Sequence, residues 1–194
     1  MSPDRRSAVL TGTFYIIGTV CGGAGLVVAL GPLRSAPDYL GAYGTMETRV
    51  LIASLLYLMM GVSLVAVAAV VYPVLRKFSP SAAIAYVGAR VLEMVVYMLI
   101  VISMHALVAL GTEYVQSGAA DAARFQTMGA IIQAVSKWTG HVVLDVAIFP
   151  IGALVLYWVF FRARLVPRWL SGWGLISAVL YWASGVLIMF RVIT

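Results

Sequence analysis

Five long apolar segments constrain the fold of this chain more than any other feature of its sequence. They run over Ala8–Leu30, Val50–Leu75, Ala82–Leu110, Trp138–Phe161 and Trp169–Phe190. Each has about 20 residues or more, the length that an α-helix needs to cross the hydrocarbon core of a bilayer. Charged residues make up only 10% of the chain, against about 25% in a soluble domain. The sequence therefore predicts an all-α integral membrane bundle of five transmembrane helices, forming one domain over residues 1–194.

The stretch DAARFQTMGAIIQAVSKW, which ends where the fourth segment begins, is ambiguous. Its apolar residues recur at spacings of three and four, which is the pattern of a helix. Arg124, Gln126, Gln133 and Lys137 interrupt this pattern and make the stretch a poor lipid-facing span. We expect either an amphipathic helix near the membrane surface or an extension of the fourth span. As a span of its own it would make the total six.

The distribution of basic residues favours five spans over six. Basic residues close to the ends of spans are retained on the cytoplasmic side of the membrane. With five spans and a cytoplasmic N-terminus, that side carries Arg5, Arg6, Arg76, Lys77, Arg162, Arg164 and Arg168. A sixth span would move the FRARLVPR loop outside and weaken this asymmetry. The net charge of +6 then meets anionic lipid headgroups of the bilayer, and no nucleic-acid partner is needed to explain it.

Several landmarks occur in a specific order along the chain. They are GPLRSAPDYL, VYPVLRKFSPSAAIAYVGARVLE, AADAARFQTMG and FFRARLVPRWLSGWGLI. This order resembles the DUF4386 family of bacterial membrane proteins, and the resemblance extends from about Thr11 to Phe190. It implies a small multi-pass protein of the bacterial inner membrane, without an established activity. The matching positions are Arg90 and Glu93 in the third segment, and Pro167 and Arg168 in the last inner loop.

The third apolar segment carries an unusual set of polar residues. On a helical wheel, an arc of about 100 to 120° contains Tyr86, Arg90, Glu93, Tyr97 and His105, so this face is predicted to point into the bundle. Arg90 and Glu93 are three residues apart and can pair, which lowers the cost of a lone charge in a span, roughly 2.5 to 3.5 kcal/mol. Two hypotheses follow. The pair is a structural clamp, or Glu93 faces a cavity and acts as a proton carrier, general acid or general base.

A second group of polar residues is predicted nearer the outer surface. In KWTGHVVLD, the residues Lys137, His141 and Asp145 are four apart and share one face of a helix. His105, near the outer end of the third segment, is expected at a similar depth. It lies about 18 Å along the helix axis from Glu93 at 1.5 Å per residue. The sequence therefore predicts two separate sites.

Several chemistries suit the outer group. His105, His141 and Asp145 suit a zinc ion with a bound water, as in a membrane hydrolase. His105 and His141 suit the axial positions of a single haem, and His141 with Asp145 suits metal-free acid–base chemistry. The two histidines can also be plain interfacial residues. We expect the isolated protein to hold no stoichiometric haem or zinc and no other cofactor, and Cys21, the only cysteine, to serve in packing.

Together these patterns favour a protein that binds or handles a small amphipathic or lipid-like molecule, or an accessory membrane subunit. The candidate ligand-binding residues are Tyr86, Arg90, Glu93, Tyr97, His105, His141 and Asp145. The alternative is a membrane enzyme that uses Glu93, His105, His141 and Asp145. A transporter is not expected from one chain, because 194 residues leave no room for the usual internal repeat unless the protein forms a homo-oligomer.

Two further patterns concern helix packing. Gly18, Gly22 and Gly25 form a stripe of small residues, which predicts close approach of the first span to a neighbouring helix. Pro150 lies inside the fourth span and removes one backbone hydrogen bond, so a kink is expected there.

Overall fold

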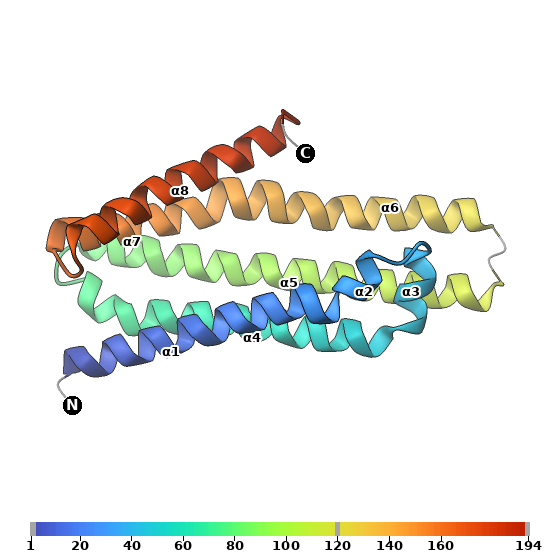
Figure 1. The fold of residues 1–194 in the computed structure, drawn as a ribbon, viewed down its shortest axis with the longest axis horizontal. Coiled ribbons are helices and arrows are strands. Elements are labelled where there is room, and N and C mark those ends of the chain that lie inside the picture. Colours follow the sequence, from blue (N-terminus) through green and yellow to red (C-terminus); the bar gives the residue numbers. More distant parts are fainter. Residues whose placement is uncertain (1–2, 119–120, 193–194) are drawn as a thin grey trace.

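The structure, a computed structural model, describes residues 3–118 and 121–192, and in these ranges it contains helices and no strand. The helices are α1 (Pro3–Ala24), α2 (Gly31–Arg34), α3 (Tyr39–Thr45), α4 (Glu47–Leu75), α5 (Pro80–Gln116), α6 (Ala122–Trp138), α7 (Phe149–Ala163) and α8 (Arg168–Met189), with π-helical segments η1 (Gly25–Ala29) and η2 (Thr139–Ile148). Figure 1 shows the long helices side by side along one axis. The start of α1 and the α4–α5 and α7–α8 turns lie at one end, and α3 lies towards the other, here called the α3 end.

The prediction of five spans is confirmed. Within the described residues, the stretches long and apolar enough to cross a membrane are Arg5–Leu33, Glu47–Leu75, Pro80–Gln116, Ala122–Ala163 and Arg168–Met189. The ambiguous stretch forms α6, which continues through η2 into α7 as one run of 42 residues. It is thus an extension of the fourth span. Because about 20 residues cross the hydrocarbon core, both this run and the 37-residue α5 are long enough to extend beyond it.

Local sequence signals set where two of the helices begin. Ser79 precedes α5, and its hydroxyl accepts a hydrogen bond from the backbone N–H of Ala82 at 3.3 Å. Pro80 occupies the first helical position, where its missing N–H costs nothing. The carboxylate of Asp38 likewise accepts from the N–H of Gly41 at 3.1 Å and starts α3. These caps satisfy backbone donors that the first helical turn leaves unpaired.

The glycine stripe of the first span packs against α4, as predicted. A Cβ atom built on Gly18 would lie 3.5 Å from the Cβ atom of Ser63, and one built on Gly25 would lie 3.2 Å from the ring of Tyr57. Small residues therefore let the two helices approach closely, which is how helices associate in a bilayer that offers no hydrophobic driving force between them.

The short helix α3 is held against α5 by a second close contact. Gly44 of α3 and Gly111 of α5 face each other, and a Cβ atom on Gly111 would lie only 2.7 Å from the backbone nitrogen of Gly44. Leu40, one turn earlier in α3, is completely buried in a cluster with Leu107 and Leu110 of α5. This contact fixes α3 at the side of the bundle where a cavity opens.

Pro150 lies at the start of α7, directly after ten residues of π-helix. The N–H of Phe149 bonds the carbonyl of Leu144, five residues earlier. Proline has no N–H that could bond the carbonyl four residues before it. The helix that precedes Pro150 is a π-helix, which is wider than an α-helix because its bonds span five residues. π-Helical segments are rare and are frequent at functional sites, and η2 contains both His141 and Asp145.

Candidate functional site

The polar residues of the third span form a continuous hydrogen-bonded ladder on α5. Arg90 and Glu93 are only 2% and 3% exposed, and Arg90 Nη1 donates to Glu93 Oε2 at 2.5 Å. Arg90 Nε donates to the hydroxyl of Tyr86 at 3.3 Å. The hydroxyl of Tyr97 donates to the other carboxylate oxygen of Glu93 at 3.0 Å. Both charges therefore find their partners on their own helix.

Aromatic rings surround this ladder. The guanidinium carbon of Arg90 lies 5.2 Å from the ring centre of Tyr86 and 5.9 Å from that of Phe149 at the start of α7. At the other end of the ladder, the ring of Tyr97 meets that of Tyr57 on α4 edge to face, with centres 6.3 Å apart. Rings that face a cation lower the cost of burying it, and the arrangement matches the clamp hypothesis.

His105 does not share the buried face of the ladder. Tyr86, Arg90, Glu93 and Tyr97 are buried, whereas His105 is exposed. Eight residues separate His105 from Tyr97, and at 100° per residue this places it about 80° away around the helix. His105 thus lies at the edge of the predicted arc, where the surface of α5 is no longer covered by the other helices.

Three polar side chains are connected along η2 and α8. His141 Nδ1 lies 3.3 Å from Asp145 Oδ2, and the hydroxyl of Tyr181 on α8 donates to Asp145 Oδ1 at 2.8 Å. The ring of Tyr181 also packs edge to face on that of Phe149, with centres 4.9 Å apart. The carboxylate of Asp145 is thereby fixed between two helices, and it orients the imidazole of His141.

The structure places the residues considered above for a metal or haem site as follows. No group of three or more His, Cys, Asp or Glu side chains in the described part of the chain is placed to hold a metal ion. His141 lines the main cavity, whereas His105 is exposed on α5 and is not among the lining residues. Of the outer group, the structure brings together His141 and Asp145.

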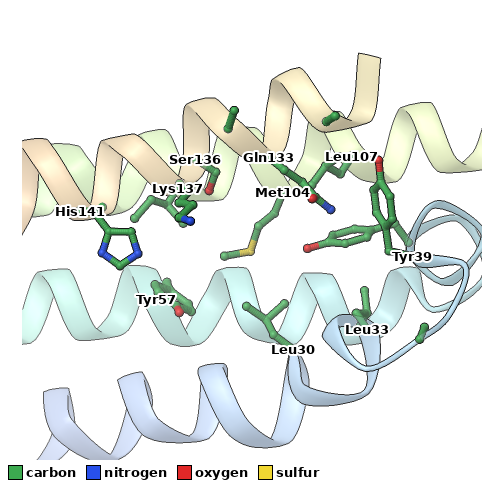
Figure 2. Close-up of a pocket in the computed structure, with 16 residues that line it drawn as sticks. Leu30, Leu33, Tyr39, Tyr57, Met104, Leu107, Gln133, Ser136, Lys137 and His141 are labelled. Carbon is green, nitrogen blue, oxygen red and sulfur yellow. The ribbon is translucent and has the colours of Figure 1, made fainter. Parts of the chain in front are cut away.

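A cavity of about 850 Å³ lies at this level of the bundle, between α4, α5 and α6. One wall is formed by α6 and η2 and carries Gln133, Ser136, Lys137 and His141. Figure 2 shows the imidazole of His141 pointing from this wall towards α4. Among the lining residues of α6, Lys137 and Gln133 are exposed, so the cavity is open along this side. This wall supplies hydrogen-bonding groups and one positive charge.

The opposite wall is mostly apolar. Leu30 and Leu33 of the η1–α2 region and Tyr57 of α4 form it (Figure 2), and Ile100, Met104 and Leu107 add further apolar lining from α5. Leu30 and Leu33 are also buried members of the core cluster that includes Leu107 and Leu110 of α5, so this part of the wall is firmly packed. Small-molecule sites in proteins are typically cavities of about 300 to 1,000 Å³ with mostly apolar linings and a few polar groups. The size and the two-sided lining both fit that description.

Tyr39 and Tyr43 of α3 line the cavity towards the α3 end. Burial, together with the neighbouring charge of Asp38, raises the pKa of the Tyr39 hydroxyl above its ordinary value. This hydroxyl donates to the backbone carbonyl of Gln126 on α6 at 3.5 Å. The hydroxyl is therefore a hydrogen-bond donor that links α3 to α6 beside the cavity.

A family model described as a domain of unknown function (DUF4386) matches residues 10–193, nearly the whole chain. The chain belongs to the DUF4386 family. The resemblance expected from the sequence landmarks is thus confirmed. No curated protein and no solved structure matches this DUF4386 protein. What the protein does has to be argued from its own geometry.

Sequence reasoning missed most of the cavity of this DUF4386 protein. The candidate residues named from sequence were charged or titratable, and among them only His141 lines the cavity. Lys137, Gln133 and Ser136 were present in the sequence as the polar side of the ambiguous stretch. A signal was available: a helix that is amphipathic and also continues into a span must turn its polar side towards either water or a cavity.

Proposed function

We propose that this DUF4386 protein binds a small amphipathic molecule in the cavity between α4, α5 and α6. The observation that carries the proposal is the two-sided lining, with Gln133, Lys137 and His141 on one wall and packed apolar side chains on the other. A molecule that is wholly apolar would leave the polar wall unsatisfied, and a wholly polar one would lose water at the apolar wall without compensation. An amphipathic molecule matches both walls.

The proposal also names the membrane, the orientation of the chain in it and the side on which the cavity lies. Five spans make the protein a multi-pass membrane protein. We propose that it lies in a bacterial inner membrane with a cytoplasmic N-terminus, because Arg76, Lys77, Arg162 and Arg164 all lie in or beside the turns at the end where α1 begins and basic loops are retained inside. The α3 end and the cavity would then face the outer leaflet.

Labelling of single cysteines tests this orientation. A membrane-impermeant thiol reagent applied to intact cells is expected to label a cysteine at residue 118, and to label one at residue 78 or 165 only after the cells are broken. The background variant is Cys21→Ser, which removes the one native thiol. Labelling of residue 165 in intact cells would contradict the proposed orientation.

A cavity-filling variant tests ligand binding. Ala134 lines the cavity from α6, so Ala134→Phe would place a ring inside it. We expect the amount of amphipathic molecule that remains bound to the protein, as counted by native mass spectrometry after extraction in mild detergent, to fall about tenfold, a loss that corresponds to about 1.4 kcal/mol.

The matched control is Ala123→Phe. Ala123 is also exposed on α6, but it is absent from the cavity lining. This variant should retain ligand as the wild type does, while both variants should melt close to the wild-type temperature, since exposed substitutions usually change stability by less than about 0.5 kcal/mol. Equal retention in Ala134→Phe and Ala123→Phe would sink the proposed function.

The connected side chains of His141, Asp145 and Tyr181 favour a second candidate, an enzyme that alters the bound molecule. A carboxylate that orients an imidazole is the arrangement used for general acid–base catalysis, and His141 both lines the cavity and contacts Asp145. Glu93 has its partners in the buried ladder and His105 is exposed. Incubating the purified protein with the molecule that it retains distinguishes the candidates. An enzyme converts that molecule into a product, which chromatography with mass spectrometry detects, and His141→Ala should abolish this conversion while the molecule still binds.

A further inference from the structure

We infer that the molecule bound in the cavity is anionic: an aliphatic chain with a carboxylate or phosphate headgroup. This inference rests on the proposed function and adds the chemical class of the ligand. It is carried by the charge of the lining. Among the residues that the structure describes in the lining, Lys137 is the one group of fixed charge, and none is an aspartate or a glutamate.

The position of Lys137 on the cavity wall suits a headgroup. It lies one helical turn before His141, and Ser136 and Gln133 flank it on the same wall. An ammonium group with hydroxyl, amide and imidazole neighbours can surround a carboxylate or phosphate with hydrogen bonds. Bonds from a charged donor to a charged acceptor are about twice as strong as neutral ones. Lys137 is therefore the residue expected to select the headgroup.

The surroundings of Lys137 add further positive charge. Its ammonium lies 5.9 Å from the ring centre of Trp138, and the guanidinium carbon of Arg191, at the end of α8, lies 6.0 Å from the centre of the same ring. The acidic side chain nearest along the helix, Asp145, contacts His141 and Tyr181. The local field thus favours an anion, and a cationic headgroup would meet Lys137 with like charge.

The apolar wall accounts for the chain of the ligand. Leu30 and Leu33 lie across the cavity from Lys137, and Met104 and Leu107 line it from α5. Each methylene group that leaves water against such side chains contributes about 0.8 kcal/mol in transfer scales. The side of the cavity formed by α6 is open. An anionic lipid of the bilayer and a free single-chain amphiphile such as a fatty acid share this chemistry.

Two probes with the same chain and different headgroups test the inference. Dodecanoate carries a negative charge and dodecanol carries none, so their relative affinities isolate the headgroup. We expect the wild type, titrated in one mild detergent and followed by native mass spectrometry, to bind dodecanoate more tightly than dodecanol. Lys137→Gln should weaken dodecanoate binding about tenfold, as for the loss of one charge-assisted hydrogen bond, and should leave dodecanol binding unchanged.

Arg124→Gln is the matched control. Arg124 is an exposed basic residue of the same helix that does not line the cavity, and its loss should leave the affinity for dodecanoate as it is. Equal affinity of the wild type for the two probes, or equal effects of Lys137→Gln and Arg124→Gln, would overturn the anionic assignment. The proposed function would survive that result as long as Ala134→Phe blocked both probes. If Ala134→Phe blocked neither probe, the function itself would fail.

A second arm identifies the source of the ligand. The protein is reconstituted in nanodiscs of phosphatidylcholine with a minor share of phosphatidylglycerol, then extracted and weighed. Enrichment of bound phosphatidylglycerol in the wild type, lost in Lys137→Gln, supports an anionic lipid taken from the bilayer. Tight dodecanoate binding without that enrichment supports a free anionic amphiphile. Enrichment of phosphatidylcholine over phosphatidylglycerol would overturn the inference.

Discussion

Replacing Glu93 by glutamine alone is expected to destabilise the protein more than replacing Arg90 and Glu93 together. In the wild type, the two charges are 2% and 3% exposed and bond each other. Glu93→Gln leaves Arg90 charged in a low-dielectric interior, and breaking a buried pair in this way costs about 3 to 5 kcal/mol. In Arg90→Met with Glu93→Gln no charge remains buried, so most of that cost should be recovered.

The measurement is a double-mutant cycle on Arg90 and Glu93. Unfolding free energies, or melting temperatures in one detergent, are compared for the wild type, both single variants and the double variant. Glu113→Gln is the control, since Glu113 is an exposed glutamate of the same helix and its loss should cost less than about 0.5 kcal/mol. Additive effects of the two substitutions would argue against the clamp. They would favour the alternative, in which Glu93 faces a cavity and acts as a proton carrier, general acid or general base.

Composition and periodicity predicted the fold well because the bilayer imposes a strong rule. Every backbone polar group in the hydrocarbon core must be bonded internally, so a segment of 20 apolar residues has essentially one choice, a helix. This is why the five spans were found from sequence. The glycine stripe around Gly18 was found for another reason, since close helix contacts in a bilayer favour small residues. The residues beyond the core, from Gly31 to Thr45, form the short helices α2 and α3, and no such rule predicts how they pack.

The buried ladder was predictable from local spacing, whereas the cavity depends on the packing of distant elements. A charge inside a span must find a partner, so Arg90 and Glu93 were recognisable from their spacing alone. A cavity forms where helices fail to fill the space between them, which depends on the lengths and angles of several elements at once. Here its lining comes from residues as far apart as Leu30 and His141, and no local pattern links them.

The structure also connects the ladder with the cavity through two aromatic rings. Tyr97 donates its hydroxyl to Glu93, and its ring packs against that of Tyr57, which lines the cavity. The Tyr57 side of the cavity is therefore backed by the buried, hydrogen-bonded ladder of α5. Pre-organised support of this kind lowers the entropic cost of binding, which is consistent with a clamp that serves the site without touching the ligand.

Gly111→Ala is expected to have the second largest effect, because it acts on the contact that holds α3 in place. A methyl group on Gly111 would collide with the carbonyl oxygen of Leu40 and the backbone of Gly44. Backbone atoms cannot rotate away as a side chain can, so α3 must move. Overpacking of this kind costs typically about 1 to 3 kcal/mol. Since α3 carries Tyr39 and Tyr43 of the cavity lining, the variant should also bind its ligand more weakly.

Gly88→Ala provides the contrast on the same helix. Gly88 is an exposed residue of α5, and a Cβ atom there would meet nothing within 4 Å. Alanine is favoured over glycine in a helix by about 1 kcal/mol, so Gly88→Ala should melt at or above the wild-type temperature and bind dodecanoate normally. The change from glycine to alanine is thus expected to lower stability at residue 111 and to keep or raise it at residue 88, because backbone atoms face Gly111 and nothing faces Gly88. If Gly111→Ala kept wild-type stability and affinity, α3 could not be a fixed wall of the cavity, and the ligand would have to be held by α4, α5 and α6 alone.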